Sequence, residues 1–282
     1  MLQLDGEVTL KGAVWTFFAL TKRMKKYYKI VLSLFSLVLC SSMIVSLFST
    51  SIKAEDRYDY NEENSLISEE EHNQLREHFE NTKEERQERA IRVHNYANEA
   101  LKKRAITKLN VPVYAQVTKT HCGPASMQMV LKFLTNTKFD QHTLGREMGM
   151  ASNGVTIDAM YRMINQHSDV SYDIGYASEG ILDEDIIYTI DQGYPLTYDV
   201  STKFLVGWES ADENHHIVGF GYETTSRGIS NVWYIDPYDH GVFDYQYEGI
   251  SPTFGKQEIS YSDLLETMKL LDYNDGYYLR IL

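Results

Sequence analysis

The chain has 282 residues, of which 43% are hydrophobic and 24% are charged, and its formal net charge at pH 7 is −13. This composition is that of a globular protein, and it excludes a mainly disordered, collagen-like or coiled-coil chain. Only one long uncharged stretch is present, which excludes a membrane protein with several spans. An acidic surface repels polyanions, so we expect neither nucleic acid nor an anionic lipid surface as a partner.

The N-terminal region has the pattern of an export signal. Residues 30–52 carry no charge, a basic cluster lies within 22–29, and the small residue Ala54 follows. This order is typical of a secretory signal peptide, so we expect cleavage after Ala54 and a secreted or cell-surface protein. The same stretch is long enough to span a bilayer, which takes about 20 residues, so an uncleaved membrane anchor is the alternative. Residues 1–54 are therefore assigned to an N-terminal extension and signal peptide or anchor.

The cysteine content indicates a reactive thiol. Cleavage after Ala54 removes Cys40 and leaves Cys122 as the single cysteine of the mature chain, which then has no internal disulfide. An unpaired thiol in an exported protein is unusual and indicates reactivity. The alternative interpretation is a small apolar residue of the core.

Residues 55–105 are predicted to form a charged linker followed by a helical segment. The linker, 55–68, is polar and has no periodicity, whereas 69–104 contains neither Gly nor Pro. Ser68 and Glu71 match a capping box, and apolar positions recur only in the second half. We expect one helix whose first half is solvated and whose second half packs against the following domain. Its role is open between an inhibitory or chaperoning pro-segment and a spacer.

From residue 106 to 282 short apolar runs alternate with helical patterns, which predicts an α+β domain with an antiparallel sheet. The acidic residues 183–185 are expected on a solvated helix start, where they favour the helix dipole. The expected helices are 125–134, 156–165, 181–192 and 260–271, and the expected strands are 196–200, 217–222, 232–235 and 277–281.

Cys122 stands directly before a predicted helix, and Pro124 suits the first turn of that helix. A thiol at a helix N-terminus is favoured as thiolate, which is the nucleophilic form. The free backbone N–H groups beside the sulfur would form an oxyanion hole. Gln116 lies six residues earlier, and its amide would supply a second donor; taken alone, it would be an ordinary surface glutamine. The neighbouring His121 is expected to point away from the thiol.

A candidate base and its orienting group follow later in the chain. His215 and His216 begin an apolar strand, and alternation puts them on opposite faces, so only one can face the thiol. A single cysteine with a histidine on a strand indicates a Cys–His nucleophile pair, although a lone histidine there is more often structural. Asp236 ends a predicted strand and would orient the imidazole. Its alternative role is that of a turn-starting Asp before Pro237.

Three motifs together resemble the C39-like branch of the papain-like cysteine peptidases. They are Gln-x5-Cys-Gly-Pro-Ala at a helix start, Asn-His-x-Ile-x-x-x-Gly-Tyr, and a strand that ends in Asp-Pro. The resemblance covers about residues 108–282. It implies a papain-like fold in which a helix bearing the nucleophile packs on an antiparallel sheet.

The resemblance also assigns the site. It implies a Cys122 nucleophile, a Gln116 oxyanion donor and Asp236 as third member of the triad. The family histidine stands six residues before the glycine of a Gly-Tyr pair, which selects His215, but the adjacent His216 leaves the base open. The site residues implied are Cys122, His215, Asp236 and Gln116.

The function implied is that of an exported cysteine peptidase acting on peptide or protein substrates. No cofactor and no metal is expected, and the sequence has no HExxH, P-loop or GxGxxG motif. One alternative is a cell-wall amidase or thiol acyltransferase with the same groups. The other is a non-catalytic surface binding protein built on the same scaffold.

Overall fold

A computed structural model describes residues 69–177, 180–208, 213–239, 254–271 and 276–282. All of them lie within one compact unit of the chain, Tyr60–Leu282. The predicted signal peptide or anchor and the predicted linker 55–68 lie outside the described residues. Within those residues, no helix combines the length and the apolar character that crossing a bilayer requires.

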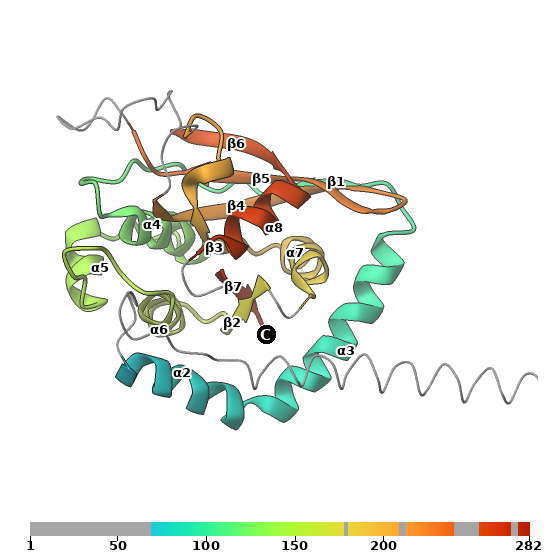
Figure 1. Cartoon of the computed structure of the whole chain (residues 1–282), viewed down its shortest axis with the longest axis horizontal. Coiled ribbons are helices and arrows are strands. Elements are labelled where there is room, and N and C mark those ends of the chain that lie inside the picture. The colour runs from blue at the N-terminus through green and yellow to red at the C-terminus, as the bar shows by residue number, and fades with distance from the viewer. Residues whose placement is uncertain (1–68, 178–179, 209–212, 240–253, 272–275) are drawn as a thin grey trace, which may run out of the picture. The chain divides into compact units, whose positions relative to one another are not determined.

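Seven strands form one antiparallel sheet in the order β2-β7-β3-β4-β5-β6, and β1 pairs with β4 (Figure 1). The long strand β4 lies between β3 and β5 and so links the two halves of the sheet. The strands are β1 Ile106–Lys108, β2 Tyr172–Tyr176, β3 Leu196–Ser201, β4 Asn214–Thr225, β5 Gly228–Asp236, β6 Gly255–Ser260 and β7 Tyr277–Ile281.

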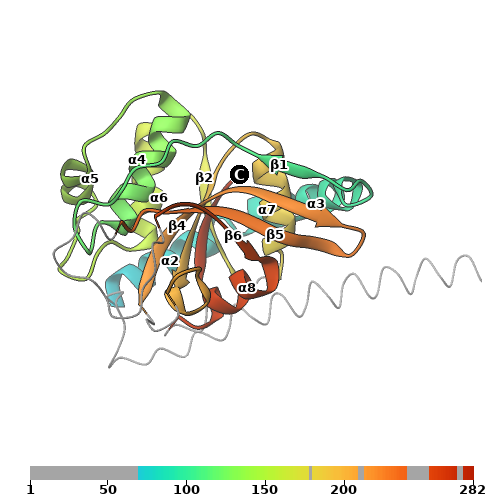
Figure 2. The same cartoon turned by 90° about the horizontal axis from the view of Figure 1, so that it is seen from above.

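Helices cover both faces of the sheet, with α4, α5 and α6 on one face and α3, α7 and α8 on the other (Figure 2). Residues of β4 enter both cores: Val218 and Phe220 enter one, and Ile217 and Tyr222 the other. The alternation changes phase between Gly219 and Gly221, where the pairing of β4 with β5 shifts in register. The helices are α2 Glu69–Asn81, α3 Lys83–Ala100, α4 Cys122–Thr135, α5 Gln141–Glu147, α6 Ile157–His167, α7 Leu182–Asp191 and α8 Tyr261–Lys269, with a 3₁₀ turn, η2, at Thr202–Phe204.

The predicted α+β class is confirmed, and so are the four helices and four strands predicted for the domain, within a few residues at their ends. Two predicted caps are also present: Thr156 accepts a hydrogen bond from the Ala159 N–H and Ser260 from the Asp263 N–H. The elements α5, β1, β2 and β6 were not predicted. They are short, and β2 is buried at every position, so it lacks the alternation that reveals a strand.

The segment before the domain differs from its prediction, because it forms two helices rather than one. The break lies at Thr82, whose backbone (φ −101°, ψ 6°) leaves the helical region and whose hydroxyl donates to the His78 carbonyl at 2.8 Å. Nor is the first half simply solvated, because Phe79 packs against the core. Both helices therefore dock on the domain (Figure 1).

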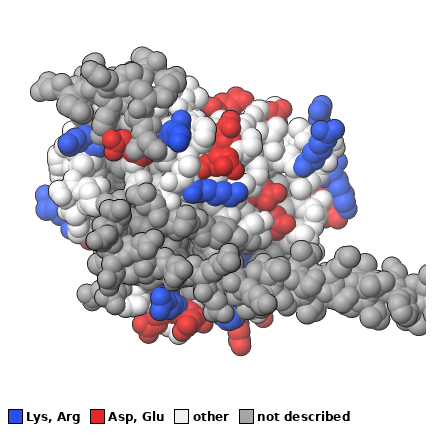
Figure 3. All heavy atoms as spheres, in the orientation of Figure 1, with Lys and Arg blue, Asp and Glu red and all other residues white. Residues whose placement is uncertain are grey.

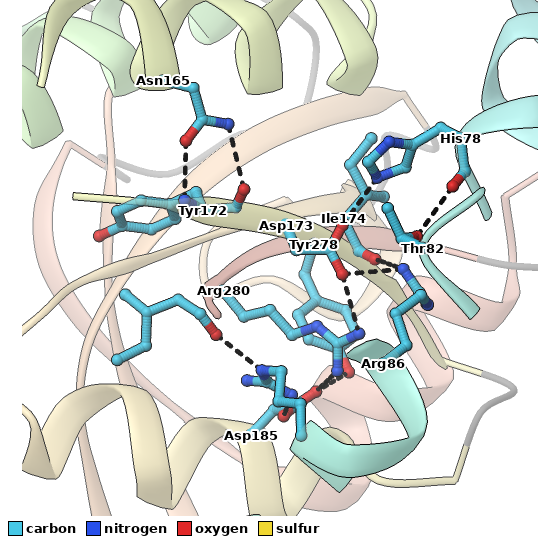
Figure 4. A network of polar contacts seen from close by, with 12 residues as sticks. His78, Thr82, Arg86, Asn165, Tyr172, Asp173, Ile174, Asp185, Tyr278 and Arg280 are labelled. Carbon is cyan, nitrogen blue, oxygen red and sulfur yellow. Dashed lines mark hydrogen bonds and ion pairs between the residues drawn. The ribbon is translucent and has the colours of Figure 1, made fainter. Parts of the chain in front are cut away.

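Asp185 corrects the expectation of a solvated acidic helix start. It is fully buried, and its carboxylate binds Arg89 Nη1 at 2.5 Å, Arg280 Nη1 at 2.5 Å and the Tyr278 hydroxyl at 2.6 Å (Figure 4). A buried carboxylate is tolerated because two guanidinium groups compensate its charge. One of these, Arg89, comes from α3.

A second buried carboxylate, Asp173 of β2, extends this network toward α2 (Figure 4). It binds His78 Nε2 and Arg86 Nη1, each at 2.9 Å, and lies 3.4 Å from Arg280 Nη2. The helical segment is thus joined to β2 and α7 by ion pairs with buried carboxylates, and to β7 by the hydrogen bond from Arg89 Nε to the Ile281 carbonyl.

The surface charge is mixed. On the face drawn in Figure 3, acidic and uncharged side chains separate the Lys and Arg residues that the structure describes. This face offers no continuous basic surface within the described part of the chain.

Candidate active site

Cys122 is the first residue of α4, so the helix begins three residues earlier than predicted. The preceding residue, His121, is the N-cap, and its carbonyl accepts the Ala125 N–H at 2.9 Å. The Cys122 side chain is buried (8% exposed). Its sulfur therefore lies at the positive end of the α4 dipole, away from bulk water.

Gly123 allows α4 to approach β4 closely. A Cβ atom at this position would clash with Val155 Cγ2 and would lie 3.3 Å from His216 Cδ2. One turn later, the Ser126 hydroxyl donates to the His216 carbonyl at 3.2 Å. The absence of a side chain at Gly123 thus brings the nucleophile candidate to the start of β4.

His215 links Cys122 to Asp236. Its Nε2 donates to Asp236 Oδ1 at 2.9 Å, and its ring is also hydrogen-bonded to the Cys122 thiol. Since Nε2 is used by the carboxylate, Nδ1 is the nitrogen left for the thiol. The structure therefore brings together three of the four residues that the sequence assigned to the site.

The electrostatics of this pair favour charge separation. Burial raises the pKa of Cys122, but the hydrogen bond from His215 and the charges of His216 and His215 outweigh it and lower the pKa to about 7. Burial lowers the pKa of His215, but the charge of Asp236 and its hydrogen bond outweigh it and raise the pKa to about 10. Both shifts favour the thiolate–imidazolium pair over the neutral pair.

Asp236 is fully buried and is held by two further donors. Trp208 Nε1 donates to its Oδ2 at 2.9 Å, and the Tyr238 backbone N–H donates to its Oδ1 at 2.8 Å. The Trp208 ring also lies 5.3 Å from the His215 ring, centroid to centroid. Sequence reasoning missed both of these donors to Asp236, and only that of Tyr238, two residues after Asp236, lies close to it along the chain.

Replacing Trp208 with phenylalanine keeps an aromatic ring but removes the donor to Asp236. We expect the free energy of unfolding to fall by about 1–3 kcal/mol, because a buried carboxylate oxygen loses its hydrogen bond. Urea denaturation measures this loss. The matched control is Trp233→Phe, which removes a 2.9 Å bond to the exposed Glu258 and should cost less because water replaces the donor. A loss no larger for Trp208→Phe would contradict the expectation.

His216 lies on the opposite face of β4, as alternation predicts. Its Nε2 is 3.1 Å from the Val155 carbonyl, and its Nδ1 is 3.7 Å from Asp199 Oδ1. The ring therefore has its own partners, distinct from those of His215.

Gln116 is fully buried, which excludes the ordinary surface position. Its backbone N–H donates to the Pro237 carbonyl at 2.8 Å, so its chain segment is held beside the residue that follows Asp236. Its Nε2 donates to the Thr118 carbonyl at 2.9 Å, and its Oε1 has no hydrogen-bond partner among the described residues. One of the two amide N–H bonds is used, which leaves a second for a ligand.

The two neighbours of Gln116 in the chain, Ala115 and Val117, line a surface pocket of about 480 Å³. This pocket contains none of Cys122, His215 and Asp236, so it is separate from the thiol. Its lining residues are Tyr114, Ala115, Val117, Gln128, Lys138, Phe139, Asp140 and Gln141.

His121 points away from the thiol, as expected. Its Nδ1 lies 2.5 Å from the Thr118 hydroxyl and its Nε2 lies 3.2 Å from His142 Nδ1. In the part of the chain that the structure describes, no three or more His, Cys, Asp or Glu side chains are grouped so that they could hold a metal ion.

The sequence model of the Peptidase_C39 like family matches residues 108–264, which contain Gln116, Cys122, His215 and Asp236. The match confirms the resemblance inferred from the sequence motifs. A search of curated proteins finds no match to this sequence.

Among solved structures, the chain is similar to the peptidase domain of Streptococcus ComA, a bifunctional ABC transporter of a quorum-sensing pathway. The identity is 14%, the match covers 61% of this chain and 98% of that one, and the TM-score is 0.40. It is also similar to the proform of the Amb a 11 cysteine protease, a ragweed pollen allergen (11% identity, 56% and 65% covered, TM-score 0.35). A third similarity is to the Salmonella effector SpvD (11% identity, 67% and 91% covered, TM-score 0.27).

Proposed function

The chain belongs to the Peptidase_C39 like family, and from this membership we propose that it is a cysteine peptidase that hydrolyses peptide bonds in peptide or protein substrates. The observation that carries the proposal is the buried thiol of Cys122 at the start of α4, hydrogen-bonded to an imidazole that Asp236 holds at 2.9 Å. The domain that acts is assigned to residues 106–282.

In the proposed reaction, the Cys122 thiolate attacks the carbonyl carbon and a C–S bond forms. The carbonyl oxygen becomes an oxyanion, which the Cys122 backbone N–H and the Gln116 amide stabilise. The His215 imidazolium gives its proton to the leaving amine, and the C–N bond breaks to leave a thioester. His215 then takes a proton from water, the water oxygen attacks the thioester, and the thiolate departs.

His215 is favoured over His216 as the base because it has a contact on each side. Its ring is hydrogen-bonded to the thiol and to the Asp236 carboxylate, which fixes its orientation and stabilises its charged form. The ring of His216 donates instead to a backbone carbonyl, that of Val155.

Thiol labelling tests the proposal. We expect iodoacetamide to alkylate Cys122 of the folded chain with a rate that rises through about pH 7, whereas an unperturbed cysteine ionises near pH 8.5. His215→Ala removes the hydrogen bond and the charge, so the rate at pH 7 should fall by about 10-fold or more. Peptide mapping identifies the labelled residue.

Two results would contradict the proposal. The first is a Cys122 that stays unlabelled until the protein unfolds, since it would then be a buried structural thiol. The second is release of soluble muropeptides from purified cell wall without cleavage of labelled casein, which would favour a cell-wall amidase.

We also propose that the protein is exported through its N-terminal 54 residues. The support is the uncharged run 30–52 behind a basic cluster, which lies outside the described residues.

A further inference from the structure

A second buried pair of titratable side chains lies beside Cys122, and the proposed reaction does not use it. His216 of β4 stands directly opposite Asp199 of β3 in the sheet register. The His216 side chain is 8% exposed and that of Asp199 15% exposed, and their Nδ1 and Oδ1 atoms are 3.7 Å apart. Burying two ionisable groups costs free energy unless each compensates the charge of the other.

The His216 ring is fixed in one orientation. Its Nε2 lies 3.1 Å from the Val155 carbonyl, which only accepts hydrogen bonds, so Nε2 carries a proton. Its Nδ1 is buried and has no hydrogen-bond partner among the described groups. A second proton on Nδ1 would make an imidazolium that faces the Asp199 carboxylate.

The same ring lies close to the nucleophile. Its Cδ2 atom is 3.3 Å from the position of a Cβ on Gly123, the residue after Cys122, and the Cys122 thiol is hydrogen-bonded to the His216 backbone. The titratable groups around His216 are Cys122 on α4, Asp199 on β3 and His215 on β4. Burial raises the pKa of Asp199, and the charges of His216 and His215 oppose that rise.

We infer that His216 and Asp199 form a second ion pair beside the nucleophile, in which His216 is a positioning residue that stabilises the Cys122 thiolate by its charge. The inference rests on the proposed function, in which that thiolate is the nucleophile. His216 neither gives nor takes a proton in the reaction. It supplies a positive charge that remains when His215 has passed its own proton to the leaving amine. A neighbouring positive charge lowers the pKa of the thiol, in agreement with the direction found for Cys122.

Substitution by glutamine separates charge from structure. In His216→Gln the amide N–H takes the place of Nε2–H and can still donate to the Val155 carbonyl, but the side chain is neutral. We expect the pH profile of Cys122 alkylation by iodoacetamide, measured on the full chain, to move up by about one unit, so that the rate at pH 6 falls about 10-fold. The kcat for casein should fall with little change in KM. His216→Ala should show the same shift of the alkylation profile and the same fall in kcat as His216→Gln.

A purely structural role gives a different result. If His216→Gln has the wild-type profile while His216→Ala does not, the side chain serves only as a hydrogen-bond donor and the inference is wrong. Should His216→Gln fail to fold, Asp199→Asn is the second test, because it removes the carboxylate that lies 3.7 Å from His216 Nδ1. An upward shift supports the pair, and an unchanged or lowered profile overturns it.

Failure of the proposed function is recognised separately. In that case the wild-type profile itself has no step below pH 8.5, which removes the basis for the inference. A wild-type step near pH 7 that His216→Gln leaves in place contradicts the ion pair alone.

Discussion

Replacing Cys122 with alanine is expected to lower the rate of casein hydrolysis on the order of 10⁵-fold, to the background rate. The reason is that no other described side chain offers a nucleophile hydrogen-bonded to His215, whose remaining partner is the Asp236 carboxylate. The measurement is release of fluorescent peptides from labelled casein at pH 7–8, where the thiolate is populated.

Cys122→Ser is the matched variant, because it keeps a side chain of similar shape. It should be equally inactive, since a hydroxyl ionises far less readily than a thiol and the His215 that is tuned to hold a thiolate cannot deprotonate it. Both variants should unfold at the same urea concentration as the wild type, within the small change that a buried sulfur makes. Full activity in Cys122→Ala would contradict the proposed reaction, because hydrolysis would then not depend on this thiol.

Arg89→Ala is expected to lower the free energy of unfolding by about 3–5 kcal/mol, the usual cost of removing one partner from a buried ion pair. Arg89 is 1% exposed, its Nη1 binds Asp185 at 2.5 Å, and its Nε donates to the Ile281 carbonyl at 2.8 Å. The substitution leaves a buried carboxylate oxygen and a strand carbonyl without these donors. Urea denaturation followed by tryptophan fluorescence measures the loss.

Arg92→Ala is the control, since Arg92 is exposed on the same helix. Its loss should stay within about 0.5 kcal/mol. Equal losses for the two variants would mean that the helix contributes by general packing alone. If the expected difference is found, residues 69–100 are a structural part of the folded protein, which argues against the spacer; the inhibitory or chaperoning pro-segment stays a prediction.

Low pH should weaken the ion pairs that join the helical segment to Asp173 and Asp185. Burial raises the pKa of Asp173, but the hydrogen bond from His78 and the charges of Arg86 and Arg280 lower it well below its ordinary value, and the pKa of Asp185 is lowered likewise by Arg280 and Arg89. Carboxylates whose pKa is lower in the folded state contribute stability that is fully present above about pH 4. That contribution is lost as the pH falls toward the folded pKa values. The difference between Arg89→Ala and the wild type should therefore shrink below pH 4.

The parts of the site that could be predicted from the sequence are those set by local patterns. Pro124, two residues after Cys122, predicts a helix start, and strand alternation places His215 and His216 on opposite faces of the strand. That these groups meet Asp236 was inferred from family motifs, because spacing along the chain does not determine which strands pair. Trp208 was missed for the same reason: its bond to Asp236 joins residues 28 positions apart, and no local pattern marks it.

Asp185 illustrates what sequence reasoning lacks. Three acidic residues at a helix start look alike whether they face water or the interior. What decides the matter is that two arginines, 96 and 95 positions away along the chain, reach the same carboxylate. Likewise, the helix break at Thr82 involves neither Gly nor Pro, and it depends on a hydroxyl that bonds four residues back.

The pairing of β4 limits how the length of this domain can vary. Near its start β4 carries His215, while its residues 221–223 pair with β1, from which the chain leads through Gln116 to Cys122. Nucleophile and base are therefore both positioned from one strand. A single inserted residue between 215 and 221 would move the pairing with β1 by one position relative to His215. Among relatives, we expect insertions and deletions to gather in the hairpin at 225–228 and to spare the stretch from His215 to Gly221.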